Sequence, residues 1–198
     1  MNTTYETKNQ KQGMSNPNEN KQGYKKTKLG WIPEEWEVVK IKNIGKVQTG
    51  NTPSKKETSY WNGSYAWATA QDFTNKYIYR TIKTLTEEGI KKARILPAES
   101  VLITCIASIG NNAIAKIPLA TNQQINAIIT FHNFNNEYIY YALNYSKKRL
   151  ETYAGKTAVP IISKSQFETF DLIVPRKYKE QQKIAQILST WDRAIEQT

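Results

Sequence analysis

The C-terminal segment constrains the fold most strongly, because its residue pattern changes from that of a strand to that of a helix within a few positions. A short apolar stretch ends at Pro175, and a charged amphipathic sequence runs from Glu180 to Glu196. The apolar residues of that sequence recur at the spacing of one helix face. They are Ile184, Ile187, Leu188, Trp191 and Ile195. The pattern predicts a C-terminal amphipathic helix that begins after the proline.

The apolar face of this helix has two interpretations. It can pack on the core of its own chain, or it can project and dock on another subunit. Gly, Asn and Pro, which commonly end helices, are all missing between Glu180 and the last residue. We therefore favour a projecting helix whose pattern is cut short rather than finished.

Composition divides the chain into three parts. Residues 1–28 contain no Leu, Ile, Val or Phe, so they cannot bury enough apolar surface to offset chain entropy, and we expect a disordered basic tail. Residues 29–175 are long enough for one globular domain. Residues 176–198 then form the start of the projecting helix.

Compartment and redox state follow from what the chain lacks. It has no apolar signal segment, and no apolar run approaches the ~18 residues of a membrane span, so we expect a cytoplasmic protein that contacts no membrane. The lone Cys105 stands in an apolar strand pattern, which favours a buried, inert thiol over a nucleophile. The single His132 cannot fill a metal shell, and we interpret it as structural.

Net charge points to a class of partner. The chain has 28 Lys and Arg against 17 Asp and Glu, and residues 29–198 keep 22 against 15, a net +7. Basic runs at 55–56, 91–94 and 147–149 alternate along the chain with aromatic residues, as is typical of nucleic-acid-binding surfaces. The aromatic residues are Tyr60, Trp61, Trp67, Tyr77 and Tyr79. Each run alone could be an ordinary solvated surface, but together they favour a nucleic-acid partner.

The order of elements predicts an α+β domain with a mixed sheet. We expect strands at 64–70, 76–82, 100–106 and 124–131, a long polar loop at 45–63, and a helix from Asn136. Thr86 is a candidate N-cap for a short helix, and Gly110 supplies the backbone freedom of a turn at 108–112.

Catalytic motifs are missing from the sequence. Neither a Gly-x-Gly-x-x-Gly dinucleotide loop nor a Gly-x-x-x-x-Gly-Lys-Ser/Thr phosphate loop occurs, and the carboxylates form no evident metal cluster. No Asn- or Asp-Pro-Pro-aromatic segment of the amino-methyltransferase kind is present. We expect a non-catalytic protein with no cofactor and no metal.

Six segments in order give the chain a family resemblance. It resembles the DNA-specificity subunits of type I restriction-modification systems across 29–198, through LGWIPEEWE (29–37), TGNTPSK (49–55), YWNG (60–63), ASIG (107–110), TNQQI (121–125) and EQQKIAQILSTWD (180–192). The resemblance implies a target-recognition domain that binds double-stranded DNA. It also implies partners, namely adenine methyltransferase subunits and a restriction (motor-nuclease) subunit.

Family members carry two recognition domains and two paired helices, whereas this chain has one of each. The resemblance therefore implies a half-subunit or an amino-terminal portion that reads one half of a bipartite site. Two copies could pair through the helix face and read a symmetric split site. Two alternatives remain: the recognition part of a single-chain restriction-methyltransferase, and a decoy that occupies methyltransferase subunits without giving them specificity.

Candidate DNA contacts fall into two groups. The candidate base readers lie in the least family-like stretches and have side chains that pair with base edges; they are Thr69, Gln71, Asp72, Asn75, Lys76 and Lys156. The candidate backbone contacts supply affinity and position; they are Lys55, Lys56, Lys91, Lys92, Arg94 and Asn111. For each residue the alternative is an ordinary solvated side chain.

Overall fold

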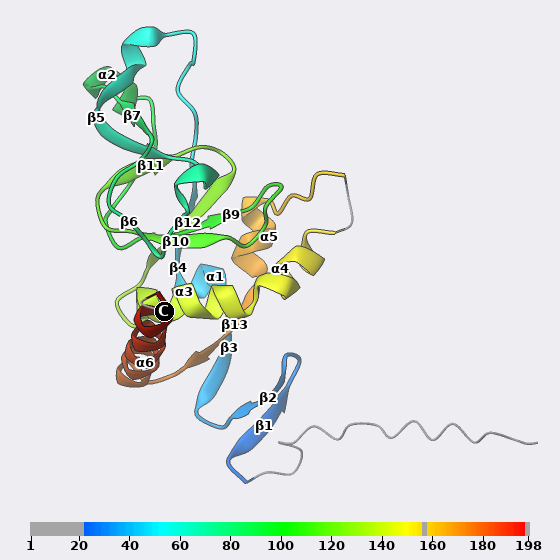
Figure 1. Cartoon of the computed structure of the whole chain (residues 1–198). Helices are drawn as coiled ribbons and strands as arrows, with labels where there is room; N and C mark the ends of the chain where they lie inside the picture. The colour runs from blue at the N-terminus through cyan, green and yellow to red at the C-terminus, as the bar shows by residue number, and fades with distance from the viewer. Residues whose placement is uncertain (1–21, 156–157, 197–198) are drawn as a thin grey trace, which may run out of the picture.

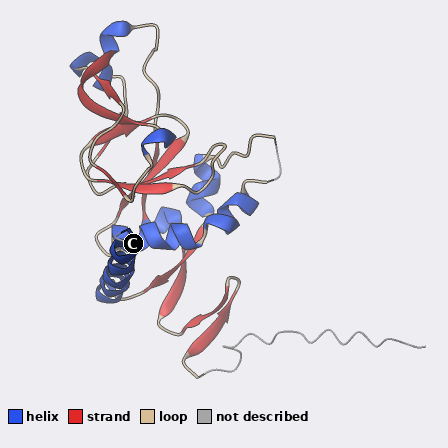
Figure 2. Ribbon diagram, viewed as in Figure 1, coloured by secondary structure: helices blue, strands red, loops and turns tan. Residues whose placement is uncertain are grey.

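The computed structural model describes residues 22–155 and 158–196, and in them it has the predicted α+β architecture with mixed sheets and a C-terminal helix (Figures 1 and 2). The strands are β1 Tyr24–Thr27, β2 Gly30–Pro33, β3 Trp36–Lys40, β4 Gly45–Thr49, β5 Trp61–Ala68, β6 Tyr77–Ile78, β7 Lys83–Leu85, β8 Ile95–Leu96, β9 Val101–Thr104, β10 Asn112–Ala115, β11 Leu119–Thr121, β12 Ile125–Thr130 and β13 Asp171–Pro175. The helices are α1 Ile41–Ile44, α2 Glu87–Ile90, α3 Asn136–Tyr145, α4 Lys147–Tyr153, α5 Lys164–Thr169 and α6 Tyr178–Glu196, with 3-10 turns η1 Thr58–Tyr60 and η2 Ala70–Asp72.

A five-stranded sheet, in the order β4-β12-β9-β10-β6, forms the centre of the molecule (Figure 1). Adjacent strands of this sheet are antiparallel, except that β6 runs parallel to β10. Side chains alternate between the two faces of a strand. In β9, Val101 and Ile103 pack on the helical side and Leu102 packs toward a second sheet. Burial on both faces explains why this strand is a continuous apolar run in the sequence.

The second sheet has four strands in the order β7-β5-β11-β8. Small residues, including Ala66, Ala68 and Ala127, contribute to the core that it shares with the first sheet. Trp67, which is 2% exposed, belongs to a separate apolar cluster with Leu85. The two sheets therefore support one another, and the segment that follows β5 starts from a buried strand end.

Local capping agrees with several predictions from the sequence. The Thr86 hydroxyl accepts a hydrogen bond from the Gly89 backbone N–H, which confirms the predicted N-cap of α2. Gly110 has a φ of +85°, the left-handed conformation expected of the turn.

Cys105 is 3% exposed, and burial raises the pKa of its thiol to about 11, which agrees with the prediction of a buried, inert thiol.

The folded part begins earlier than the composition predicted. Tyr24–Thr27 forms β1 and pairs antiparallel with β2, so the prediction of disorder for 1–28 is wrong at these residues, while 1–21 lie outside the described part of the chain. Backbone pairing with β2 holds β1 in place although β1 itself has no aliphatic side chain. The Thr27 hydroxyl donates to the Gly30 carbonyl at 2.8 Å and closes the turn.

Other boundaries also differ from prediction. The predicted loop at 45–63 contains β4 and the start of β5, and the predicted strand at 76–82 is reduced to β6. The helix predicted from Asn136 divides at Ser146 into α3 and α4. His132 is exposed in the turn after β12, so it takes no part in the described core. Among the described helices, none combines the length and the apolar character that crossing a membrane requires.

Gly89 offers a test of this packing. A Cβ at Gly89 would lie 2.1 Å from the Tyr60 carbonyl oxygen, a backbone atom that cannot move aside cheaply. Alanine favours helices by up to about 1 kcal/mol over glycine, but overpacking costs about 1–3 kcal/mol, so the clash dominates. We expect Gly89→Ala to lower the free energy of unfolding by about 1–2 kcal/mol in urea denaturation. The exposed neighbour substitution Glu88→Ala should change it by less than about 0.5 kcal/mol; equal effects would contradict the packing.

Candidate nucleic-acid interface

The segment of residues 69–82, here called the reading segment, connects β5 to β7 and contains η2 and β6. Asp72 closes it on itself. One carboxylate oxygen accepts the Thr69 backbone N–H, and the other accepts the Ile82 backbone N–H, both at 2.7 Å. The Thr69 hydroxyl joins the same capping box. Thr69 and Asp72 are two of the predicted base readers. Their hydroxyl and carboxylate groups, which base contacts would require, are instead engaged in hydrogen bonds within the segment.

Gln71 and Asn75 are exposed on the segment and line an open cleft of about 560 Å³ along it. The same cleft is lined by Arg80 and Ile82, which the sequence prediction missed, and by Tyr79, which it named only among the aromatic residues. Tyr79 is 63% exposed, Ile82 is 71% exposed, and Arg80 lies exposed between them. The sequence signal was present, since two large apolar residues flank an arginine, but assigning 76–82 to a strand concealed it.

One described predicted reader, Lys76, does not reach this cleft. The Lys76 ammonium donates to the Tyr141 hydroxyl and the Ser189 hydroxyl, each at 3.0 Å, and forms an ion pair with Glu137. Its side chain is 10% exposed, so the prediction that Lys76 contacts bases is wrong. Lys156 lies outside the described residues.

Basic side chains gather beside the second sheet. Lys55, Lys56, Lys92 and Arg94 are exposed, and none of them forms an ion pair with a described carboxylate. Lys91 forms an exposed pair with Glu87 at 2.9 Å, a contact of little energy that a phosphate could replace.

Asn51 fixes part of this basic group. Its amide donates to the Lys92 carbonyl at 2.7 Å and accepts the Arg94 backbone N–H at 2.8 Å. The Arg94 guanidinium also donates to the Thr49 carbonyl at 3.0 Å. Arg94 precedes β8 and Thr69 follows β5, and both strands pair with β11 at its Ala120. The two residues therefore lie at one end of the sheet, about 10 Å apart by strand spacing.

Asn111 occupies a different setting from the other predicted backbone contacts. Its amide oxygen accepts the Lys147 ammonium at 2.7 Å. It lines a cavity of about 450 Å³ together with Asn75 and Asn144. Asn112, at the same cavity, has a buried side-chain oxygen without a hydrogen-bond partner among the described residues. Asn111 therefore neighbours the reading segment rather than the basic group.

The aromatic residues differ in availability. Trp61 and Trp67 pack edge to face with ring centres 5.0 Å apart, and the Tyr77 hydroxyl donates to Glu137 at 2.7 Å. These three rings stabilise the domain, and of the two other predicted aromatic residues Tyr60 is half-buried and Tyr79 is exposed in the cleft. The described residues include no group of three or more His, Cys, Asp or Glu that could hold a metal ion. The cleft and the basic side chains beside it supply hydrogen-bond donors, amides and positive charge, which are the groups that contact bases and phosphates.

Helix α6 attaches to the domain through a polar face. Gln181 is 1% exposed; its amide accepts the Asn135 backbone N–H at 2.8 Å and donates to the Pro175 carbonyl at 2.9 Å. Ala185 is buried, and Ser189 and Asp192 continue this face at helical spacing with contacts to Lys76 and Tyr141.

The predicted apolar stripe lies on the neighbouring face of α6 and is largely open to solvent. Ile184 packs partly against the core. The exposed fractions of the other members are Ile187 50%, Leu188 37%, Trp191 65% and Ile195 71%. The stripe is thus not folded back into its own domain.

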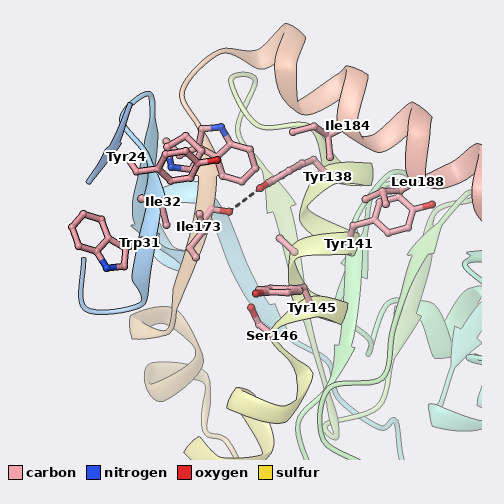
Figure 3. Close-up of a pocket in the computed structure, with 13 residues that line it drawn as sticks. Tyr24, Trp31, Ile32, Tyr138, Tyr141, Tyr145, Ser146, Ile173, Ile184 and Leu188 are labelled. Carbon is pink, nitrogen blue, oxygen red and sulfur yellow. Dashed lines mark hydrogen bonds between the residues drawn. The ribbon is translucent and has the colours of Figure 1, made fainter. Parts of the chain in front are cut away.

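An apolar groove of about 390 Å³ continues from the stripe (Figure 3). Ile184 and Leu188 of α6 form one wall, Tyr145 and neighbouring residues of α3 form another, and Trp31 of the hairpin lies opposite. The Tyr138 hydroxyl donates to the Ile173 carbonyl at 2.9 Å, the bond drawn in Figure 3, and fixes α3 to β13. Hairpin, α3 and α6 therefore present one apolar surface.

Comparison with known proteins places this geometry in a family. The family model described as the type I restriction modification DNA specificity domain matches residues 33–198. The chain is 39% identical over 180 residues to the MjaIX specificity subunit of Methanocaldococcus jannaschii, covering 87% of this chain and 41% of that one. It is 29% identical over 175 residues to the HindI specificity subunit of Haemophilus influenzae, covering 83% and 38%.

Solved structures agree at the level of the fold. The crystal structure of the HsdS subunit from Thermoanaerobacter tengcongensis matches with a TM-score of 0.66 at 17% identity, covering 83% of this chain and 39% of that one. A structure from a study of complex assembly in the type I R-M system matches with a TM-score of 0.70 at 16% identity. The chain thus spans about two fifths of the length of these relatives. With its family model matched along most of its length, the chain belongs to the type I restriction-modification DNA specificity domain family.

Proposed function

We propose that this domain binds double-stranded DNA and reads one half of a bipartite site, and that it directs adenine methyltransferase and restriction subunits to that site. The observation that carries the proposal is the reading segment, which is held rigid by Asp72 and exposes Gln71, Asn75 and Arg80. Amide and guanidinium groups are the side chains that pair bidentately with adenine and guanine edges. The fold and the family support this assignment.

Recognition and affinity are divided between two groups of residues. Base contacts come from Gln71, Asn75 and Arg80, while Tyr79 and Ile82 offer apolar contact to thymine methyl groups. Phosphate contacts come from the exposed basic group at the same end of the sheet, especially Lys92 and Arg94. Thr69 and Asp72 support the segment from inside.

The stripe of α6 supplies the subunit interface in this proposal. It pairs with the same stripe of a second copy, antiparallel, so that two reading segments face two inverted half-sites. Exposure of Ile187, Trp191 and Ile195 favours a partner, because contiguous exposed apolar surface commonly marks an interaction site. Methyltransferase subunits then dock around the paired helices and the apolar groove beside them.

The DNA proposal separates readers from phosphate contacts. Duplexes selected by the protein from a random pool define its preferred site. Gln71→Ala should cost about 1–3 kcal/mol on that site and little on random DNA, whereas Lys92→Ala should weaken both and flatten the slope of log affinity against log salt by about one unit. Fluorescence anisotropy over a salt series measures both quantities.

Matched controls lie on α6, where Gln182→Ala and Lys179→Ala remove an exposed amide and an exposed ammonium. Neither should change DNA affinity. Equal losses from Gln71→Ala on preferred and random duplexes would refute its role as a reader. A protein that binds a methyltransferase subunit but shows no sequence preference in gel shifts would be a decoy.

The stripe proposal is tested on oligomeric state. Trp191→Asp places a charge in the stripe and should abolish self-association, because a buried unpaired carboxylate at a helix interface is strongly unfavourable. Gln186→Asp places the same charge on an exposed polar position of α6 and should leave association unchanged. Sedimentation velocity at micromolar concentration compares the two. A wild-type chain that remains monomeric, with or without methyltransferase subunits, contradicts the self-pairing.

A further inference from the structure

Lys76 stands at a junction that its sequence context does not reveal. It lies in the reading segment, and its carbonyl accepts the Ile114 N–H at 2.7 Å, which fixes its backbone to the central sheet. Its ammonium lies between α3 and α6, with Glu137 and Tyr141 on the first helix and Ser189 on the second. The ammonium also lies 4.5 Å from the centre of the Tyr141 ring, within cation–π distance.

Tyr141 extends the contact to a second position on α6. Its hydroxyl accepts from Lys76 and donates to the Asp192 carboxylate at 2.5 Å. Burial raises the pKa of Tyr141, and the hydrogen bond to Asp192 raises it further, so the hydroxyl stays protonated and able to donate. One buried ammonium is thus joined, directly or through one hydroxyl, to two successive turns of α6.

These contacts hold the part of α6 that lies beyond its N-terminal anchor. Gln181 fixes the first turns of the helix to the loop before α3 and to the end of β13. Ser189 and Asp192 fix the later turns, and Asp192 and Ile195 line the same cavity as Thr74 and Asn75 of the reading segment. The exposed stripe residues Trp191 and Ile195 stand on these later turns.

We infer that Lys76 is a positioning residue that locks the C-terminal half of α6 to the reading segment, so that DNA on the segment and a partner on the stripe influence one another. The inference rests on the proposed function for the identity of the two ligands, and on the contacts above for the lock itself. A duplex that immobilises the segment suppresses local opening of these turns and so strengthens binding of a partner to the stripe. By reciprocity, a partner on the stripe strengthens DNA binding by the same factor.

The lock is tested by hydrogen–deuterium exchange of α6 amides. Lys76→Met alone leaves the partly buried Glu137 carboxylate without its ammonium partner and can unfold the domain, so the double variant Lys76→Met with Glu137→Gln keeps the site neutral. Ser189→Ala removes only the direct hydrogen-bond partner of Lys76 on α6 and leaves the ion pair with Glu137 in place. Both should speed exchange at 187–195 about tenfold while 181–185 change by less than about twofold.

Lys83→Met, on the exposed edge strand β7, is the matched control and should leave every α6 amide unchanged. Adding a selected duplex should slow exchange at 187–195 in the wild type and in Lys83→Met, but not in the two lock variants. Unchanged exchange at 187–195 in both lock variants without DNA would overturn the inference. A wild type that binds no duplex would instead refute the proposed DNA function, and the exchange without DNA would still decide the lock.

Discussion

The attachment of α6 through polar and small side chains is the interaction on which the rest of the structure depends. Gln181 and Ser189 hydrogen-bond to the domain and Ala185 is buried, so that of the large apolar residues of the stripe only Ile184 packs partly against the core. A buried amide is tolerated there because its oxygen and nitrogen are both satisfied. The conventional amphipathic arrangement, with the apolar face inward, would have consumed the stripe. Here the helix has a polar inner face and an apolar face that is largely exposed.

The reading segment likewise has some residues that hold it in place and others that are exposed. Asp72 accepts hydrogen bonds from backbone groups at both ends of the segment, while Gln71 and Asn75 are exposed on it. A loop held in this way loses less conformational freedom when it binds a ligand. Lys76 belongs to this segment, and its ammonium contacts Ser189 of α6 and Glu137 of α3. The reading segment and α6 are therefore joined through the contacts of one side chain.

Periodicity and capping were sufficient to predict much of the fold. The buried strands β9 and β12, the cap at Thr86, the turn at Gly110 and the helix α6 all follow from local patterns that tertiary contacts do not override. Strand β1 could not be predicted in this way, because backbone pairing with β2, rather than an apolar face of its own, holds it in place. Residue type could nominate Thr69, Asp72 and Lys76 for DNA contact, but it could not show that their polar groups are already engaged. Those partners lie as far away in sequence as Ser189, and only the fold brings them together.

We propose that one recognition domain and its exposed helix stripe suffice, in two copies, to define a split DNA site. Sequencing methylated adenines in a strain that carries this chain and one methyltransferase subunit tests it most directly. Pairing of two copies through the stripe predicts a bipartite motif whose two halves are identical and inverted about a fixed spacer. An asymmetric motif, or methylation without any motif, would contradict it.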